Sequence, residues 1–319
     1  MPAEQVRLVR VATRRTIAEQ VFELELESID GTRLPDWEPG AHIDLRLGSD
    51  LIRQYSLVPS SSGREGTWTI AILVEPEGRG GSVLISETLH PGTEVKTSGP
   101  RNHFALSPGG EYWFVAGGIG ITPMLAMCAA ADSAGARWRL SYLGRDRVAM
   151  PYLDELQARY PGRVETHIRS DDRRLDASAA IRAMAQGTGV YVCGPERLLD
   201  EIEAAMAPDR LADVHLERFH PRDDVFAPNT DFTVYAAKSD IEFVVPHDET
   251  IILAADFEGI TVEGDCLEGT CGSCETRVLL GAVEHRDSVL GPLERLAARS
   301  MMICVSRAAP GCDRLELDL

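Results

Sequence analysis

The chain has 319 residues, of which 44% are apolar and 26% charged, and its formal net charge is −18. This composition excludes a disordered or collagen-like chain, and the length predicts two or three domains. The acidic balance argues against nucleic-acid binding, because phosphate recognition needs a basic face. The N-terminus lacks the apolar core of a secretion signal, and glycines and a proline interrupt the uncharged stretch 112–131. We therefore expect a cytoplasmic protein without a membrane span.

Residues 1–106 predict an antiparallel β-barrel. Apolar and polar residues alternate over 22–27 and again over 42–47, which is typical of half-buried strands. A more continuous apolar strand is expected over 68–74, and Pro and Gly residues separate these runs. Short strands at this spacing favour a small barrel over a sandwich of long strands.

Residues 107–227 predict a doubly wound α/β domain. Strands are expected over 112–116, 139–143, 164–168 and 190–193, and helices over 124–131, 153–159, 177–185 and 196–206. This alternation indicates a parallel sheet with helices between its strands. A linker is expected over 226–229.

Residues 228–319 predict a separate acidic unit. From position 231 onward there are 17 acidic and 7 basic residues, a balance of −10. A hairpin is expected over 232–236 and 241–245, followed by a short helix over 251–256. Five of the seven cysteines lie in this unit. Such clustering is more typical of metal binding than of a disulfide framework.

The cysteine loop predicts a plant-type [2Fe–2S] cluster. Cys266, Cys271 and Cys274 have the spacing C-x4-C-x2-C, and Cys304 follows 30 residues later. The alternative is a zinc knot, although zinc usually takes two C-x2-C-like pairs and only one is present. Cys312 is a rival fourth ligand, but we prefer Cys304 because it ends the apolar run 301–303.

A glycine turn separates the first strand of the α/β domain from its first helix. Gly117, Gly118 and Gly120 leave room for a pyrophosphate at the positive end of that helix. Thr122 is expected to cap the helix, with Pro123 as its first residue.

A second turn, formed by Cys193, Gly194 and Pro195, also follows a strand and precedes a helix. Both turns should lie at carboxyl ends of parallel strands, where open α/β sheets bind ligands. The alternative is a pair of tight connections that bind nothing.

The barrel contains two candidate ligand segments. Arg53 can pair with a phosphate, Tyr55 offers a face to a flat ring, and Ser56 offers a hydroxyl to a ring nitrogen. A glycine-and-N-cap anion site is expected at Gly80, Gly81 and Ser82. Taken singly, an exposed arginine and a simple turn would explain the same residues.

Together and in this order, the segments resemble the phthalate dioxygenase reductase family, which includes the reductase components of vanillate and phenoxybenzoate oxygenases. The resemblance covers essentially the whole chain. It implies an FMN-binding barrel (1–106), an NAD-binding α/β domain (107–227) and a β-grasp ferredoxin domain with the cluster (228–319). Phe219 resembles the family's segment near the flavin and is expected to cover its ring, with core packing as the alternative. The expectation that the flavin is FMN rather than FAD rests on the family's domain order.

The resemblance also implies an NADH-dependent flavin iron–sulfur oxidoreductase that serves a terminal oxygenase, expected to be a Rieske-type enzyme of aromatic catabolism. A flavin is needed because NADH gives electrons in pairs and the cluster accepts them singly. Thr122 and Cys193 are expected to position the nicotinamide, and Ser56 to hydrogen-bond near the reactive flavin nitrogen. The alternative is a redox-sensing flavin and iron–sulfur module without an oxygenase partner.

Two further expectations concern specificity. Asp171 and Asp172 follow the strand 164–168 and favour a free ribose hydroxyl, hence NADH, although Arg145, Arg173 and Arg174 could reverse this. The acidic C-terminal unit suggests a partner with a basic docking patch. Its alternative is an acidic surface that only favours solubility.

Overall fold

The computed structural model describes residues 6–48, 51–172, 174–222 and 226–319. The chain divides into two compact units, Met1–Glu217 and Arg218–Leu319. Among the described residues, no helix is both long and apolar enough to cross a bilayer.

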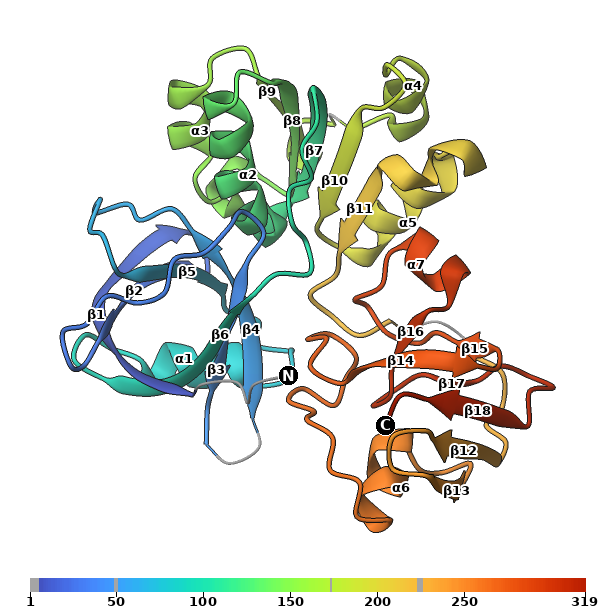
Figure 1. The fold of residues 1–319 in the computed structure, drawn as a ribbon. Coiled ribbons are helices and arrows are strands. Elements are labelled where there is room, and N and C mark those ends of the chain that lie inside the picture. The colour runs from blue at the N-terminus through green and yellow to red at the C-terminus, as the bar shows by residue number, and fades with distance from the viewer. Residues whose placement is uncertain (1–5, 49–50, 173, 223–225) are drawn as a thin grey trace. The chain divides into compact units, whose positions relative to one another are not determined.

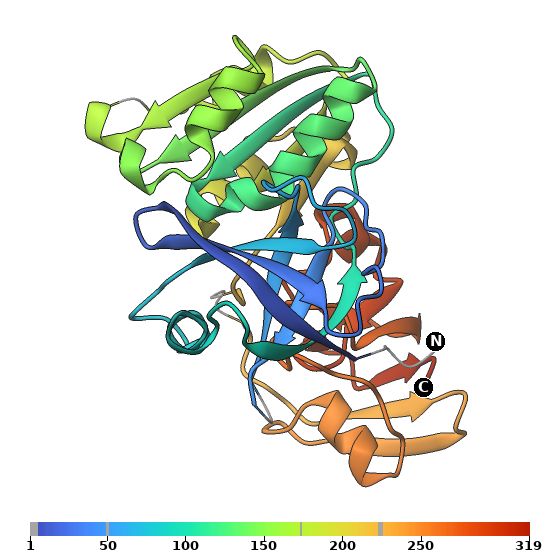
Figure 2. The same cartoon turned by 90° about the vertical axis from the view of Figure 1, so that its left-hand side faces the viewer.

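The first unit begins with a closed six-stranded barrel in the order β1-β2-β5-β4-β3-β6, visible in Figure 1. Its strands are β1 (Arg7–Ala18), β2 (Val21–Ser28), β3 (His42–Arg46), β4 (Ile52–Val58), β5 (Trp68–Leu73) and β6 (Glu94–Arg101). Helix α1 (Gly81–Thr88) lies between β5 and β6 in the chain and is seen end-on in Figure 2. Leu24, Ile43 and Trp68 are fully buried in the barrel core. The predicted antiparallel barrel is confirmed.

The alternating pattern predicted that β2 and β3 are half-buried. The structure instead buries nearly all of their residues. Glu23 and Glu25 are 3% and 2% exposed. Tyr152 donates a hydrogen bond of 2.9 Å to Glu23, and Arg64 binds Glu25 at 3.0 Å. The second face of β2 is therefore covered by polar groups that satisfy its carboxylates, which makes burial of these charges tolerable.

The rest of the first unit is a parallel sheet in the order β11-β10-β7-β8-β9. Its strands are β7 (Glu111–Gly117), β8 (Arg137–Gly144), β9 (Val164–Ile168), β10 (Gly189–Cys193) and β11 (Val214–Glu217). Helices α2 (Ile121–Ser133) and α3 (Leu153–Arg159) cover one face, and α4 (Ala177–Arg182) and α5 (Glu196–Ala205) cover the other (Figure 1). Short 3₁₀ turns lie at η1 (Gly118–Gly120), η2 (Arg147–Ala149), η3 (Arg169–Asp171) and η4 (Pro208–Asp213). The strand order reverses between β7 and β10, which is where such sheets bind ligands.

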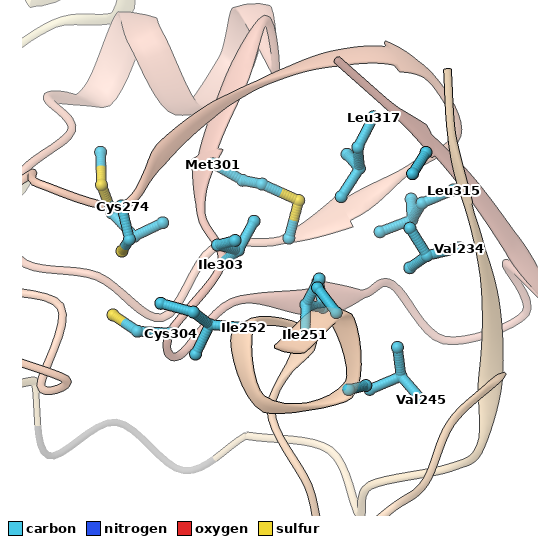
Figure 3. Close-up of a cluster of buried hydrophobic side chains, with 14 of the residues drawn as sticks. Val234, Val245, Ile251, Ile252, Cys274, Met301, Ile303, Cys304, Leu315 and Leu317 are labelled. Atoms are coloured by element: carbon cyan, nitrogen blue, oxygen red, sulfur yellow. The ribbon is translucent and has the colours of Figure 1, made fainter. Parts of the chain in front are cut away.

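The second unit contains a mixed sheet in the order β13-β12-β18-β14-β16, with β12 and β18 parallel and a separate β15-β17 pair. Its strands are β12 (Phe232–Ala236), β13 (Ile241–Val245), β14 (Glu275–Leu280), β15 (Val283–Glu284), β16 (Ser300–Met302), β17 (Arg307–Ala308) and β18 (Arg314–Leu317). Its helices are α6 (Ile251–Phe257) and α7 (Pro292–Ala297). Figure 3 shows Ile251 of α6 facing the core side chains of the sheet. The predicted hairpin and short helix are both present.

The chain segment expected to be a linker is fixed to this unit by Arg286. The Arg286 guanidinium donates a 2.8 Å hydrogen bond to Asn229 and stacks 4.9 Å from the centre of the Phe226 ring. Its charge is balanced by Glu284.

Candidate functional site

The two predicted nucleotide turns pack against each other, backbone to backbone. A Cβ atom added to Gly120 would lie 2.3 Å from the carbonyl oxygen of Cys193. One added to Gly117 would lie 2.6 Å from Cδ of Pro195, and one on Gly194 would lie 2.9 Å from Gly117. Only glycine permits this approach, so the glycines place the ends of β7 and β10 in contact where the strand order reverses.

The predicted capping role of Thr122 is wrong. Helix α2 begins at Ile121 with Gly120 as its N-cap, because the 3₁₀ turn η1 runs directly into it. Thr122 is 2% exposed and donates its hydroxyl at 3.0 Å to the carbonyl of Ile119. Pro123 is consequently the third helical residue rather than the first.

Cys193 faces a carboxyl that sequence reasoning missed. Parallel pairing of β10 with β11 sets Cys193 opposite Glu217, so the thiol lies beside the Glu217 carboxyl. Burial raises the pKa of Glu217 to about 8 and the pKa of Cys193 well above its ordinary value. One oxygen of Glu217 has no hydrogen-bond partner among the described residues. The pair therefore holds protons at neutral pH, next to the glycine turn.

The first candidate flavin segment meets the second at Gly81. A Cβ atom on Gly81 would lie 2.7 Å from both Cγ and Nε of Arg53. Arg53 in turn donates to the carbonyl of Arg79 at 3.2 Å. Gly80 is the N-cap of α1, has φ of 78° and provides no side-chain cap, so the helix start is open to an anion. Ser82 lies inside the helix and accepts a 3.0 Å hydrogen bond from the Glu75 amide instead of capping.

Ser56 and Tyr55 lie on β4, against which α2 packs. The Ser56 hydroxyl is buried, with 5% of the residue exposed, and has no hydrogen-bond partner in the part of the chain that the structure describes. Burial raises the pKa of Tyr55, so its ring stays neutral. An orphaned buried hydroxyl fits a polar ligand such as a flavin ring, because leaving it unpaired costs free energy.

The residues predicted to choose between NADH and NADPH at the ribose follow the ends of β8 and β9. Asp171 ends η3, directly after β9, and is exposed. Arg145 is paired with Glu19 at 2.6 Å and with Asp146 at 2.7 Å, so its charge is already balanced. Arg173 lies outside the described residues. Phe219 is partly buried in the bend after β11, at the start of the second unit. The roles of Asp171 and Phe219 remain predictions.

Four cysteine thiols converge in the second unit. The side chain of Cys266 reaches those of Cys271 and Cys304, and Cys304 also reaches Cys274. Backbone amides of Glu268 and Thr270 point at the Cys266 sulfur, each at 3.4 Å. Such amides stabilise the negative charge of a thiolate cluster. In the described part of the chain, no group of three or more His, Cys, Asp or Glu side chains is placed so that it could hold one metal ion.

Glycines shape the same loop. Gly269 and Gly272 have φ of 70° and 76°, and a Cβ atom on Gly269 would lie 2.6 Å from Val305. Cys312, the rival ligand, lies elsewhere: its thiol donates to the carbonyl of Arg314 at 3.2 Å and accepts from the Ala282 amide at 3.3 Å. The structure thus brings together the four predicted ligands and leaves Cys312 out.

Comparison with protein families identifies the C-terminal part. Residues 234–309 match the 2Fe-2S iron-sulfur cluster binding domain. Among curated proteins, the phenoxybenzoate dioxygenase subunit beta of Ectopseudomonas oleovorans is 39% identical over 305 residues, covering 94% of this chain and 92% of the relative. The vanillate O-demethylase oxidoreductase of a Pseudomonas species is 35% identical over 320 residues, covering 98% and 99%.

Solved structures agree. Phthalate dioxygenase reductase, described as a modular structure for electron transfer from pyridine nucleotides to [2Fe–2S], is 33% identical with a TM-score of 0.69, and 98% of each chain is covered. An intact type IV self-sufficient cytochrome P450 monooxygenase is 38% identical with a TM-score of 0.88. That match covers 98% of this chain but 41% of the monooxygenase.

The resemblance inferred from the segments is therefore confirmed over nearly the full length. The ordered barrel, parallel sheet and cluster-binding fold, together with these relatives, show that the chain belongs to the phthalate dioxygenase reductase family of oxygenase reductase subunits.

Proposed function

We propose that the chain takes electron pairs from NADH through FMN and delivers them singly, through its [2Fe–2S] cluster, to a terminal oxygenase. The observation that carries this proposal is the convergence of Cys266, Cys271, Cys274 and Cys304 in a chain that also packs two glycine turns together at a sheet switch point.

The barrel residues fit FMN. Arg53 and the open start of α1 at Gly80 and Gly81 would hold its phosphate, and Tyr55 would cover one face of its ring. The unpaired Ser56 hydroxyl would donate a hydrogen bond to the ring. When bound, FMN supplies the step between paired and single electrons.

The ends of β7 and β10 fit the dinucleotide. Helix α2 would place its positive end at the pyrophosphate, beside Gly117, Gly118 and Gly120. Cys193, neutral because it is buried, would pack beside the nicotinamide as a positioning residue, and Glu217 would hold a proton next to it. Asp171 would bind the free ribose hydroxyl of NADH.

We propose a Rieske-type oxygenase as the partner, in keeping with the dioxygenase and demethylase systems named among the relatives. A haem monooxygenase is a second candidate, supported by the likeness to the self-sufficient P450 enzyme. With either partner the proposed electron donor is NADH, so we place this function in the cytoplasm.

The experiment uses the purified full chain. We expect about one FMN and two irons per chain, and anaerobic NADH should bleach the flavin first and the cluster second. In Cys304→Ser, NADH should still bleach the flavin, but the later bleaching of the cluster should be absent. A sample without flavin and acid-labile sulfide after reconstitution, or one that NADH does not reduce, would contradict the proposal. The two candidate partners separate by which purified oxygenase, Rieske or P450, accepts electrons.

A further inference from the structure

An exposed apolar pair lies on helix α6. Leu253 is 50% exposed and Phe257 is 79% exposed. The two residues are four positions apart, so they lie on the same side of the helix. The core side of the helix is formed by Ile251, Ile252, Ala254 and Ala255. The pair therefore contributes nothing to the core and costs free energy in water.

A third exposed apolar residue lies in the cysteine loop. Leu267 follows the ligand Cys266, is 56% exposed and has φ of 55°. A leucine in this left-handed conformation is strained, and such strain concentrates at functional positions.

Gly264 connects this loop to α6. A Cβ atom on Gly264 would lie 2.5 Å from Ile252 of α6 and 3.2 Å from Leu267. Figure 3 shows Ile252 close to Cys304. We refer to Leu253, Phe257 and Leu267 together as the apolar face.

The chain segment that carries the apolar face has acidic residues and no Lys or Arg. Residues 246–274 contain seven Asp and Glu residues and no Lys or Arg. The structure gives Asp256, Glu258 and Glu263 no ion pair with any described residue, and all three are exposed. Three basic residues elsewhere in the unit are paired: Lys238 with Asp318, Arg314 with Glu242 and Arg286 with Glu284. The segment that carries the apolar face and the cysteine loop therefore has a net negative charge.

We infer that the apolar face is the surface through which electrons leave the protein, and that it takes an electron-accepting protein whose redox centre has an apolar edge ringed by Lys and Arg. An apolar centre with a charged rim is the usual anatomy of a specific interface. The carboxylates would steer a basic partner, and the apolar residues would hold it beside the cysteine loop. This inference rests on the proposed function, because it assumes a cluster in that loop.

The test uses the full holoprotein and cytochrome c, a basic protein with lysines around an exposed haem edge. We expect Leu253→Ser combined with Phe257→Ser to lower kcat/KM for NADH-driven cytochrome c reduction at least tenfold. The matched control is Leu280→Ser combined with Leu296→Ser, two residues of this unit that are 62% and 74% exposed and lie outside the acidic segment. That control should leave kcat/KM unchanged.

A second experiment removes negative charge beside the apolar face. Asp256→Asn combined with Glu258→Gln should flatten the dependence of cytochrome c reduction on salt, because fewer charges then steer the encounter. In all variants the stopped-flow rate at which NADH reduces the cluster should stay within twofold of the wild-type rate.

Unchanged cytochrome c kinetics in the apolar variant would overturn the inference. A parallel loss in the Leu280 and Leu296 control would overturn it as well. Slower reduction of the cluster by NADH would show that the face serves transfer within the chain, which also contradicts it. Failure of the wild-type cluster to become reduced would instead contradict the proposed function.

Discussion

The Cys193 thiol lies beside the Glu217 carboxyl at the carboxyl ends of two neighbouring parallel strands. Burial raises the pKa of Glu217 from its ordinary 4.5 to about 8, so the folded chain keeps a proton that the unfolded chain loses. The pair is a neutral polar contact beside the expected nicotinamide, where a fixed negative charge would be costly to bury.

This relationship predicts a pH-dependent stability. Between pH 4.5 and 8 the folded state binds more protons than the unfolded state, so the free energy of unfolding should fall as pH rises. The contribution of one group is at most about 1.4 kcal/mol per pH unit. We expect Glu217→Gln to make the profile flatter across this window, whereas the exposed Glu77→Gln should not.

Urea unfolding followed by tryptophan fluorescence measures this effect in the right unit. All four tryptophans, at positions 37, 68, 113 and 138, lie in the first unit. Identical slopes for wild type and Glu217→Gln would show that Glu217 is not the titrating group.

The packing of the two turns predicts a strong effect of a single methyl group. Gly120→Ala places a Cβ atom 2.3 Å from the Cys193 carbonyl oxygen and 2.7 Å from the Gly194 amide nitrogen. Backbone atoms cannot rotate away, so the turns must separate, at a cost of about 1–3 kcal/mol. We expect the KM for NADH to rise at least tenfold while bound FMN is retained.

Gly110→Ala is the matched control, because a Cβ atom there meets nothing within 4 Å. Ferricyanide reduction gives the KM, and tryptophan fluorescence gives the stability. A normal KM in a stable Gly120→Ala protein would mean that the contact between the turns does not shape the nucleotide site.

Local sequence patterns were sufficient for most strands and for finding cysteines that the fold brings together. The strand predicted over 164–168 and the helix over 153–159 coincide with β9 and α3, because short-range periodicity determines both. The C-x4-C-x2-C spacing likewise identified three cysteines that one short loop brings together.

Prediction was wrong or silent where distant residues decide. Burial of Glu25 depends on Arg64, 39 positions away, and burial of Glu23 depends on Tyr152, 129 positions away. Glu217 reaches Cys193 only through the register of two parallel strands. No pattern within a short window contains these partners, so tertiary structure was needed to find them.

The ion pair of Arg145 predicts an effect on nucleotide choice. Glu19 holds the Arg145 guanidinium at 2.6 Å, beside the end of β8. We expect Glu19→Gln to release part of this cation and to raise kcat/KM for NADPH relative to NADH several-fold, because arginine attracts a ribose 2′-phosphate. Asp171→Ser should shift the ratio in the same direction, and Glu77→Gln should leave it unchanged. An unaltered ratio in Glu19→Gln would show that Arg145 does not lie near the ribose.

The cysteine geometry predicts opposite outcomes for two serine variants. Cys304 reaches both Cys266 and Cys274, whereas Cys312 is engaged with Arg314 and Ala282. Cys304→Ser should therefore lose the cluster absorption and most of the iron, because a thiolate ligand is replaced by a weaker oxygen ligand. Cys312→Ser should keep both, along with NADH-driven cluster reduction. Iron and sulfide counts with electron paramagnetic resonance of the reduced protein decide between them, and FMN content serves as the internal control. Loss of the cluster in Cys312→Ser with retention in Cys304→Ser would exchange the two assignments.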